Sequence, residues 1–101
     1  MAHTLQVLYR QPDDPDEFRR YYRDHHLPLA RAIPGVLCVR YTLDVTSLAG
    51  EASYFAVFEA DFADLTSLQS ALASPEGQRA QADVVHFASG GVDILHFSQT
   101  C

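Results

Sequence analysis

The order of its strand-like and helical segments is the feature that most restricts how this chain can fold. Residues 4–10, 36–43 and 92–98 alternate apolar and polar side chains, as half-buried strands do, and residues 54–60 form the most aromatic run. Helical patterns occupy residues 14–34 and 64–85. The order β-α-β-β-α-β predicts a ferredoxin-like α+β fold, with a four-stranded antiparallel sheet and both helical layers on one face.

Capping residues and prolines predict where the helical segments begin, break and end. Asp14 is a suitable N-cap for the first segment, and Pro34-Gly35 supplies a stop signal. Pro28 lies inside that segment, lacks an amide hydrogen and crowds the carbonyl four residues earlier, so we expect the helix to kink or restart there. In the second segment, Asp64 and Ser74 each mark a start, which indicates two helices in tandem.

Length and charge limit the possible functions of the chain. Its 101 residues have room for one domain, residues 1–101. Thirteen acidic against seven basic residues give a net charge of −6, which argues against nucleic acid or an anionic membrane as partner. We expect a cytoplasmic protein, because no run approaches the length of a membrane span and no signal peptide is recognisable. Cys38 and Cys101 lack the spacing of a disulfide framework or metal motif, so we expect free thiols.

The predicted sheet has one cleanly apolar face and one mixed face. The apolar face is expected to meet the helices, and the mixed face is too apolar to remain in water. We therefore expect a homodimer in which two sheets close face to face around a partly polar interior, a suitable place for a small-molecule ligand. The mixed face comprises Gln6, Leu8, Arg10, Cys38, Arg40, Asp93, Leu95 and Phe97, together with Phe55, Val57 and Glu59 on the third strand.

Residues 21–29 contain the densest group of chemically active side chains, with two tyrosines, two histidines and an aspartate beside Pro28. An imidazole titrates near neutral pH, which suits proton transfer. At about 100° per residue, His25 lies in the middle of the apolar stripe and His26 at its edge. We therefore expect His25 to be the more buried and His26 to be the catalytic candidate. The alternative is one core and one surface histidine without a catalytic role.

Other candidates are weaker. Tyr22 is suited to donate a hydrogen bond to a substrate oxygen, although an aromatic at helical spacing is more often a core residue. His86, with Asp83 nearby, is a remote catalytic candidate, and His96 is expected to pack in the core. No metal is expected, because adjacent histidines point in different directions and no metal-binding spacing is present. Nucleotide and haem motifs are also absent, so we expect no cofactor.

Several of these motifs together resemble the EthD family, named after ethyl tert-butyl ether degradation. They are Val7-Leu8-Tyr9, Asp16-Glu17-Phe18, Tyr21-Tyr22-x-x-x-His26-Leu27-Pro28-Leu29, Pro34-Gly35, and Asp83, Phe87 and Gly91-Val92 near the end. The resemblance implies a dimeric α+β barrel and a link to small-molecule catabolism or polyketide-type metabolism. It also assigns the family's histidine to His26.

Together with these residues, the resemblance implies a cofactor-independent isomerase, cyclase or monooxygenase acting on a small apolar or aromatic compound. His26 is the expected general acid or base, with Tyr22 and His86 as further catalytic candidates. The expected substrate-binding residues are Arg40, Arg10, Glu59 and Phe55. One alternative is a non-catalytic ligand-binding or accessory protein of a monooxygenase pathway. An electron-transfer or haem-handling barrel is a third possibility, although no ligand spacing supports it.

Overall fold

A computed structural model describes residues 2–100, so Cys101, one of the two expected free thiols, lies outside the described residues. The elements, in chain order, are β1 (His3–Arg10), α1 (Pro15–Tyr21), the π-helical turn η1 (Tyr22–His26), α2 (Leu27–Arg31), β2 (Cys38–Thr42), β3 (Tyr54–Phe62), α3 (Leu65–Ala73), α4 (Pro75–Asp83), the 3-10 helix η2 (Val84–His86) and β4 (Val92–Ser98). Within residues 2–100, each helix is too short or too polar to span a lipid bilayer.

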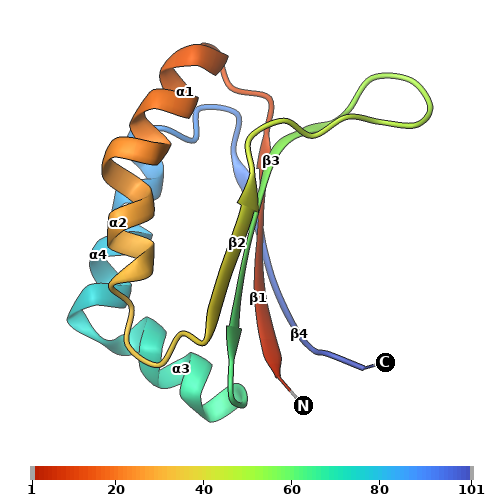
Figure 1. Cartoon of the computed structure of the whole chain (residues 1–101). Helices are drawn as coiled ribbons and strands as arrows, with labels where there is room; N and C mark the ends of the chain where they lie inside the picture. The colour runs from red at the N-terminus through yellow and green to blue at the C-terminus, as the bar shows by residue number, and fades with distance from the viewer. Residues whose placement is uncertain (1, 101) are drawn as a thin grey trace.

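The four strands form one antiparallel sheet in the order β2-β3-β1-β4. All the helices lie on one face of this sheet, and the other face is open (Figure 1). This arrangement confirms the predicted ferredoxin-like fold. Strand β1 is central because it pairs with both β3 and β4, which leaves β2 and β4 as the two edges.

The first helical segment contains the predicted interruption next to Pro28. Helix α1 begins after Asp14, whose side chain accepts a hydrogen bond from the Glu17 amide at 3.1 Å. Pro28 cannot donate to the carbonyl of Asp24. The chain widens just before it into η1, in which the Leu27 amide donates to the Tyr22 carbonyl, and α2 then starts with Pro28 in its first turn.

This wide turn reverses the expected burial of the two histidines. A π turn contains more residues than an α turn, so each residue rotates less around the axis. His26 is consequently buried, with 5% of its surface exposed, and His25 is exposed. The prediction that His25 is the more buried of the two is therefore wrong, because it assumed a uniform α-helix.

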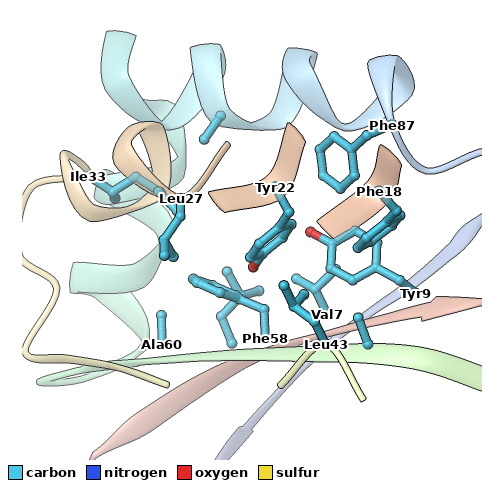
Figure 2. Packing of buried hydrophobic residues seen from close by; sticks show 14 of the residues in the cluster. Val7, Tyr9, Phe18, Tyr22, Leu27, Ile33, Leu43, Phe58, Ala60 and Phe87 are labelled. Carbon is cyan, nitrogen blue, oxygen red and sulfur yellow. The ribbon is translucent and has the colours of Figure 1, made fainter. Parts of the chain in front are cut away.

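The core between helices and sheet combines aliphatic side chains with a cluster of aromatic rings beside α1 and η1 (Figure 2). Phe18 of α1 packs against Tyr9 of β1 at 5.4 Å between ring centroids and against Phe87 at 5.1 Å. Tyr22 stacks on Phe18 at 5.9 Å and is completely buried. The Tyr22 hydroxyl lies near the Tyr9 hydroxyl, yet it has no hydrogen-bond partner among residues 2–100.

Phe55 also belongs to this core, which corrects its expected place on the open sheet face. The pairing of β1 with β3 shifts between Tyr9 and Arg10, so that Arg10 pairs with Tyr54 and Phe55 is left as an extra residue. Its ring lies 5.1 Å from Phe18 and is 6% exposed. The alternation of side chains along β3 is broken at this irregularity, which the sequence pattern did not predict.

The edge strands are less covered than the sequence pattern predicted. Ile94 of β4 is 56% exposed, and Leu37, just before β2, is 66% exposed. His96 is exposed rather than packed in the core, and its Nδ1 lies 2.8 Å from Nε2 of His3. The helices are too few to cover both edges of the sheet. Cys38 of β2 is an exposed free thiol.

The open face has the predicted mixture of charged and apolar side chains. Arg40 contacts Glu59 and Asp61, both at 2.8 Å, and Arg10 contacts Asp93 at 2.6 Å. On β4 of the same face, Leu95 and Phe97 are 47% and 37% exposed. In the single chain, large apolar side chains on this face are therefore in contact with water.

Replacing Tyr22 by phenylalanine tests the energetic cost of its unpartnered hydroxyl. A buried polar group without a hydrogen bond costs about 1–3 kcal/mol, so Tyr22→Phe is expected to raise the free energy of unfolding by about 1 kcal/mol. Urea denaturation followed by circular dichroism measures this difference. A loss of stability would contradict the assignment and show that the hydroxyl has a partner.

Candidate functional site

A small pocket of about 220 Å³ lies between the helices and the sheet. Most of its wall is apolar, with Leu5 and Phe58 from the strands and Val84 from η2. Three side chains with polar groups also line it: Tyr9, His26 and Gln81. The pocket opens to solvent on the side of Val85 and Ile94, which are 82% and 56% exposed. A mostly apolar hollow with a few polar groups is the usual form of a small-molecule site.

A larger groove of about 660 Å³ lies between α1 and the end of β2, but its character differs. It is an open surface depression lined by Arg19, Arg23 and Asp44, among others. None of the residues lining it is a histidine or another group that titrates near neutral pH. The smaller pocket is therefore the better candidate for chemistry.

His26 is held at the pocket by a carboxylate from a distant part of the chain. Its Nδ1 lies 3.0 Å from Oδ2 of Asp83, the last residue of α4. The other carboxylate oxygen of Asp83 accepts a hydrogen bond from the Tyr21 hydroxyl at 2.6 Å. Because a carboxylate only accepts, Nδ1 of the neutral imidazole carries the hydrogen, and Nε2 is left with its lone pair. The Tyr21–Asp83–His26 group thus fixes both the orientation and the tautomer of the imidazole.

The surroundings of His26 keep it neutral at pH 7. Burial lowers the pKa of His26 below its ordinary value of 6.5, and the hydrogen bond to Asp83 and the charge of Asp83 partly oppose this effect. The same carboxylate raises the pKa of Tyr21 through its hydrogen bond, so Tyr21 remains a donor. A neutral imidazole with a free Nε2 is able to act as a general base.

Aromatic rings clamp the imidazole in place. Phe87, just after η2, lies 4.6 Å from His26 and 5.6 Å from Tyr21 between ring centroids. Tyr22 packs on another side of His26 at 5.3 Å. Figure 2 shows Phe87, Tyr22 and Phe18 together beneath the helices. These contacts restrict the rotation of the His26 ring, which is only 5% exposed.

The structure brings only some of the sequence-predicted site residues together. His26 lines the pocket, and Asp83, considered together with His86, is its hydrogen-bond partner. Tyr22 lies beside His26 in the core and does not line the pocket. His86 is exposed on η2 and belongs to a different surface depression, which Tyr21 and Phe87 also line.

The expected substrate-binding residues lie elsewhere. Arg10, Arg40 and Glu59 are on the open face of the sheet, so the sheet itself separates them from His26. Phe55 is in the core against Phe18. The pocket of the single chain lies on the helix side, whereas the sequence analysis placed it on the opposite face of the sheet.

Three residues of the site were missed. Tyr9, Tyr21 and Gln81 resemble ordinary members of a strand or helix, and their spacing carries no chemical signal. The doubled tyrosine before His26 was a usable hint for Tyr21. Within residues 2–100, no group of three or more His, Cys, Asp or Glu side chains is arranged to hold a metal ion.

The fold and the buried histidine–aspartate pair define a ferredoxin-like protein with a small helix-side pocket. Residues 10–91 match the sequence model of the EthD domain, so the chain belongs to the EthD family. An uncharacterized 11.0 kDa protein in the thcB-thcC intergenic region of Rhodococcus erythropolis is 39% identical over 95 residues, covering 92% of this chain and 90% of that protein.

Solved structures agree with this assignment. An ethyl tert-butyl ether degradation (EthD) family protein from Bacillus halodurans is 32% identical, with a TM-score of 0.93 over 99% of this chain and all of that one. The cofactor-independent oxygenase SnoaB from Streptomyces nogalater, at 15% identity and a TM-score of 0.64, covers 97% of this chain and 91% of its own, and shows the same fold. Several other structural neighbours are described as dimeric.

The protonation state of His26 is testable by NMR. We expect the His26 pKa in the folded protein to lie below 6.5, and Asp83→Asn to lower it further, because the variant removes the negative charge that favours the imidazolium. Titration of the imidazole carbon-bound protons measures both values. His25→Gln is the matched control that identifies the His25 signal. A pKa that rises in Asp83→Asn would contradict the assigned contact.

Proposed function

We propose that this chain is a cofactor-independent enzyme of the isomerase, cyclase or monooxygenase type. Its substrate is a small apolar or aromatic compound bound in the helix-side pocket, and His26 is the general acid–base. The observation that carries this proposal is the imidazole itself: it lines an apolar pocket, and Asp83 holds its Nδ1 at 3.0 Å. This arrangement leaves Nε2 as the proton acceptor.

The three reaction types have a first step in common, removal of a proton from an activated substrate. A buried, neutral imidazole is suited to this step, because the Asp83 carboxylate, already 3.0 Å from Nδ1, stabilises the imidazolium that forms when Nε2 takes the proton. Because His26 is only 5% exposed, this interaction is weakly screened by water. The oxygenase SnoaB, with the same fold, is described as cofactor-independent. That description supports the proposal as an analogy of fold.

We also propose that the protein is a homodimer whose sheets face each other. Leu95 and Phe97 are exposed on the open face, and burying a large apolar side chain gains about 1.5–3 kcal/mol. The dimeric neighbours support the same arrangement. In such a dimer the ion pairs of Arg10, Arg40 and Glu59 are enclosed between the two sheets. We therefore assign them to the interface and its interior, apart from the His26 pocket.

Replacing His26 tests the catalytic proposal. In D₂O, the wild-type protein is expected to speed deuterium incorporation into small enolisable ketones, and His26→Gln to lower that rate by about 10²–10⁴-fold. Proton NMR of the ketones measures the exchange. Glutamine keeps an amide able to donate to Asp83, which limits structural damage. The exposed neighbour provides the matched control, because His25→Gln removes an imidazole that does not line the pocket.

Equal exchange rates in the two variants would rule out His26 as the base. Binding of the ketones by wild type without any acceleration of exchange would instead support the non-catalytic, ligand-binding alternative. The His26→Gln replacement is also expected to lower the free energy of unfolding more than a replacement of an exposed residue would. Because His26 is buried and hydrogen-bonded, we expect His26→Gln to lose about 1 kcal/mol of stability while remaining folded.

The dimer is testable by sedimentation. The wild-type protein is expected to sediment with twice the mass of the 11.2 kDa chain, and Leu95→Glu to shift it toward the monomer, because a charge on the open face opposes its burial. Leu48→Glu is the matched control, since Leu48 is fully exposed in the connection between β2 and β3. A wild-type monomer at micromolar concentration would contradict the proposal.

A further inference from the structure

Tyr9 is the one tyrosine among the residues that line the pocket, and it approaches from the opposite wall to His26. It stands on β1 of the sheet, whereas His26 comes from the helix layer. Its side chain is 1% exposed to solvent, so its hydroxyl lies inside the protein. Figure 2 shows this hydroxyl pointing up from the strand toward Tyr22 and the helices. Tyr22 does not reach it with hydrogen-bond geometry.

The Tyr9 ring is fixed by the same aromatic residues that hold His26. Its centroid lies 5.4 Å from Phe18, 5.4 Å from Phe87 and 5.8 Å from Tyr22. Phe87 and Tyr22 also contact His26. The two polar side chains are therefore positioned by shared neighbours. A fixed donor requires little reorganisation when a substrate binds.

The phenol of Tyr9 remains a hydrogen-bond donor throughout the accessible pH range. Burial raises the pKa of Tyr9 far above its ordinary value; the neighbouring Tyr22 hydroxyl lowers it and the charge of Asp83 raises it, each by less than burial does. Tyr9 and His26 both line the same pocket of about 220 Å³. A neutral donor and a neutral acceptor, Nε2 of His26, thus share one small space.

The remaining polar side chain of the pocket, Gln81, already uses its hydrogen-bond donor within the protein. Gln81 donates through its side-chain amide to the Leu72 carbonyl at 2.9 Å and the Gly77 carbonyl at 3.0 Å. None of the residues lining the pocket is an aspartate, glutamate, lysine or arginine. Because a charged ligand would be buried without a partner, the pocket favours an uncharged one. Its volume of about 220 Å³ is below the range typical of drug-sized ligands, about 300–1,000 Å³.

We propose that Tyr9 binds the carbonyl oxygen of a small, uncharged ketone or lactone and stabilises the oxyanion that forms when His26 removes the neighbouring proton. This inference rests on the proposed function and names its substrate class. It adds Tyr9, which the sequence analysis did not include among the candidate site residues. Tyr9 touches the substrate, so it acts directly in the reaction.

The step balances without a co-reactant. The lone pair of His26 Nε2 takes a proton from the carbon next to the carbonyl, and that C–H bond breaks. Its electron pair forms a carbon–carbon double bond, and the π electrons of the carbonyl move to oxygen. Tyr9 keeps its proton and donates a hydrogen bond to the enolate oxygen. The imidazolium then returns this proton to the same carbon or to a conjugated one; in D₂O the Nε2 proton first exchanges with a solvent deuteron, which is delivered to carbon in its place, and the isomer or the labelled ketone leaves.

Deuterium exchange tests the catalytic part of this inference. With cyclohexanone and 1-indanone as probes, Tyr9→Phe is expected to lower kcat for exchange in D₂O by about 10²-fold, with a much smaller change in KM. The control Tyr41→Phe removes a hydroxyl from a ring that packs against Tyr22 at 5.7 Å and does not line the pocket, and its rates should equal those of wild type. A Tyr9→Phe rate equal to the wild-type rate overturns the proposal.

Infrared spectroscopy of the bound probe gives a readout independent of turnover. The carbonyl stretch of bound cyclohexanone is expected at a lower frequency in wild type and Tyr41→Phe than in Tyr9→Phe, because a hydrogen bond weakens the C=O bond. Methylenecyclohexane has the same shape without the oxygen, so its affinity should be equal in all three proteins. The proposal fails if the wild-type protein binds cyclohexanone no better than methylenecyclohexane, or if the carbonyl stretch of bound cyclohexanone is not shifted. Both measurements use the wild-type protein, so they decide the question even if Tyr9→Phe does not fold.

The two proposals fail in distinguishable ways. Exchange that is lost in His26→Gln but unchanged in Tyr9→Phe overturns the role of Tyr9 and leaves the catalytic role of His26 in place. A shifted carbonyl stretch that depends on Tyr9, without acceleration of exchange by the wild-type protein, supports the Tyr9 contact and overturns the enzymatic function.

Discussion

The wide turn before Pro28 is the constraint on which the site depends. Pro28 removes one backbone donor from the helix, and the π-helical turn η1 places His26 on the buried side of the helix layer. Only in that position does its Nδ1 reach Asp83, at the end of α4. A regular α-helix through the same residues would turn His25 inward instead. A local irregularity, frequent at functional sites, therefore decides which histidine faces the pocket.

The pocket combines an apolar wall with two polar side chains that suit proton transfer. Its walls are apolar, and its polar groups come from opposite sides, His26 from the helices and Tyr9 from the sheet. Burial keeps both groups neutral, because it lowers the pKa of the imidazole and raises that of the phenol. The protein thereby holds an acceptor and a donor together without charging either, which suits proton transfer on an uncharged molecule.

The sheet separates two different environments. Its helix side contains the aromatic core and the pocket, while its open face has ion pairs around Arg40 beside exposed Leu95 and Phe97. In the proposed dimer the open face is covered by a second copy, and the pocket on the other face stays within one chain. The two proposals are consequently independent: the dimer rests on apolar area, and the catalytic role rests on His26 and Asp83.

Local sequence patterns determined the order of the elements, the caps at Asp14 and Asp64, the interruption at Pro28 and the mixed face of the sheet. These features depend on neighbours within a few residues, which period and capping rules describe well. The choice of His26 also came from sequence, through the family motif, although the helical argument for it was wrong because it assumed 100° per residue throughout η1. The tertiary structure alone decided the contact of His26 with Asp83, 57 residues away, the extra residue that turns Phe55 inward, and the place of Tyr9 in the pocket. Contacts between distant segments depend on how the layers pack, and no local pattern specifies that packing.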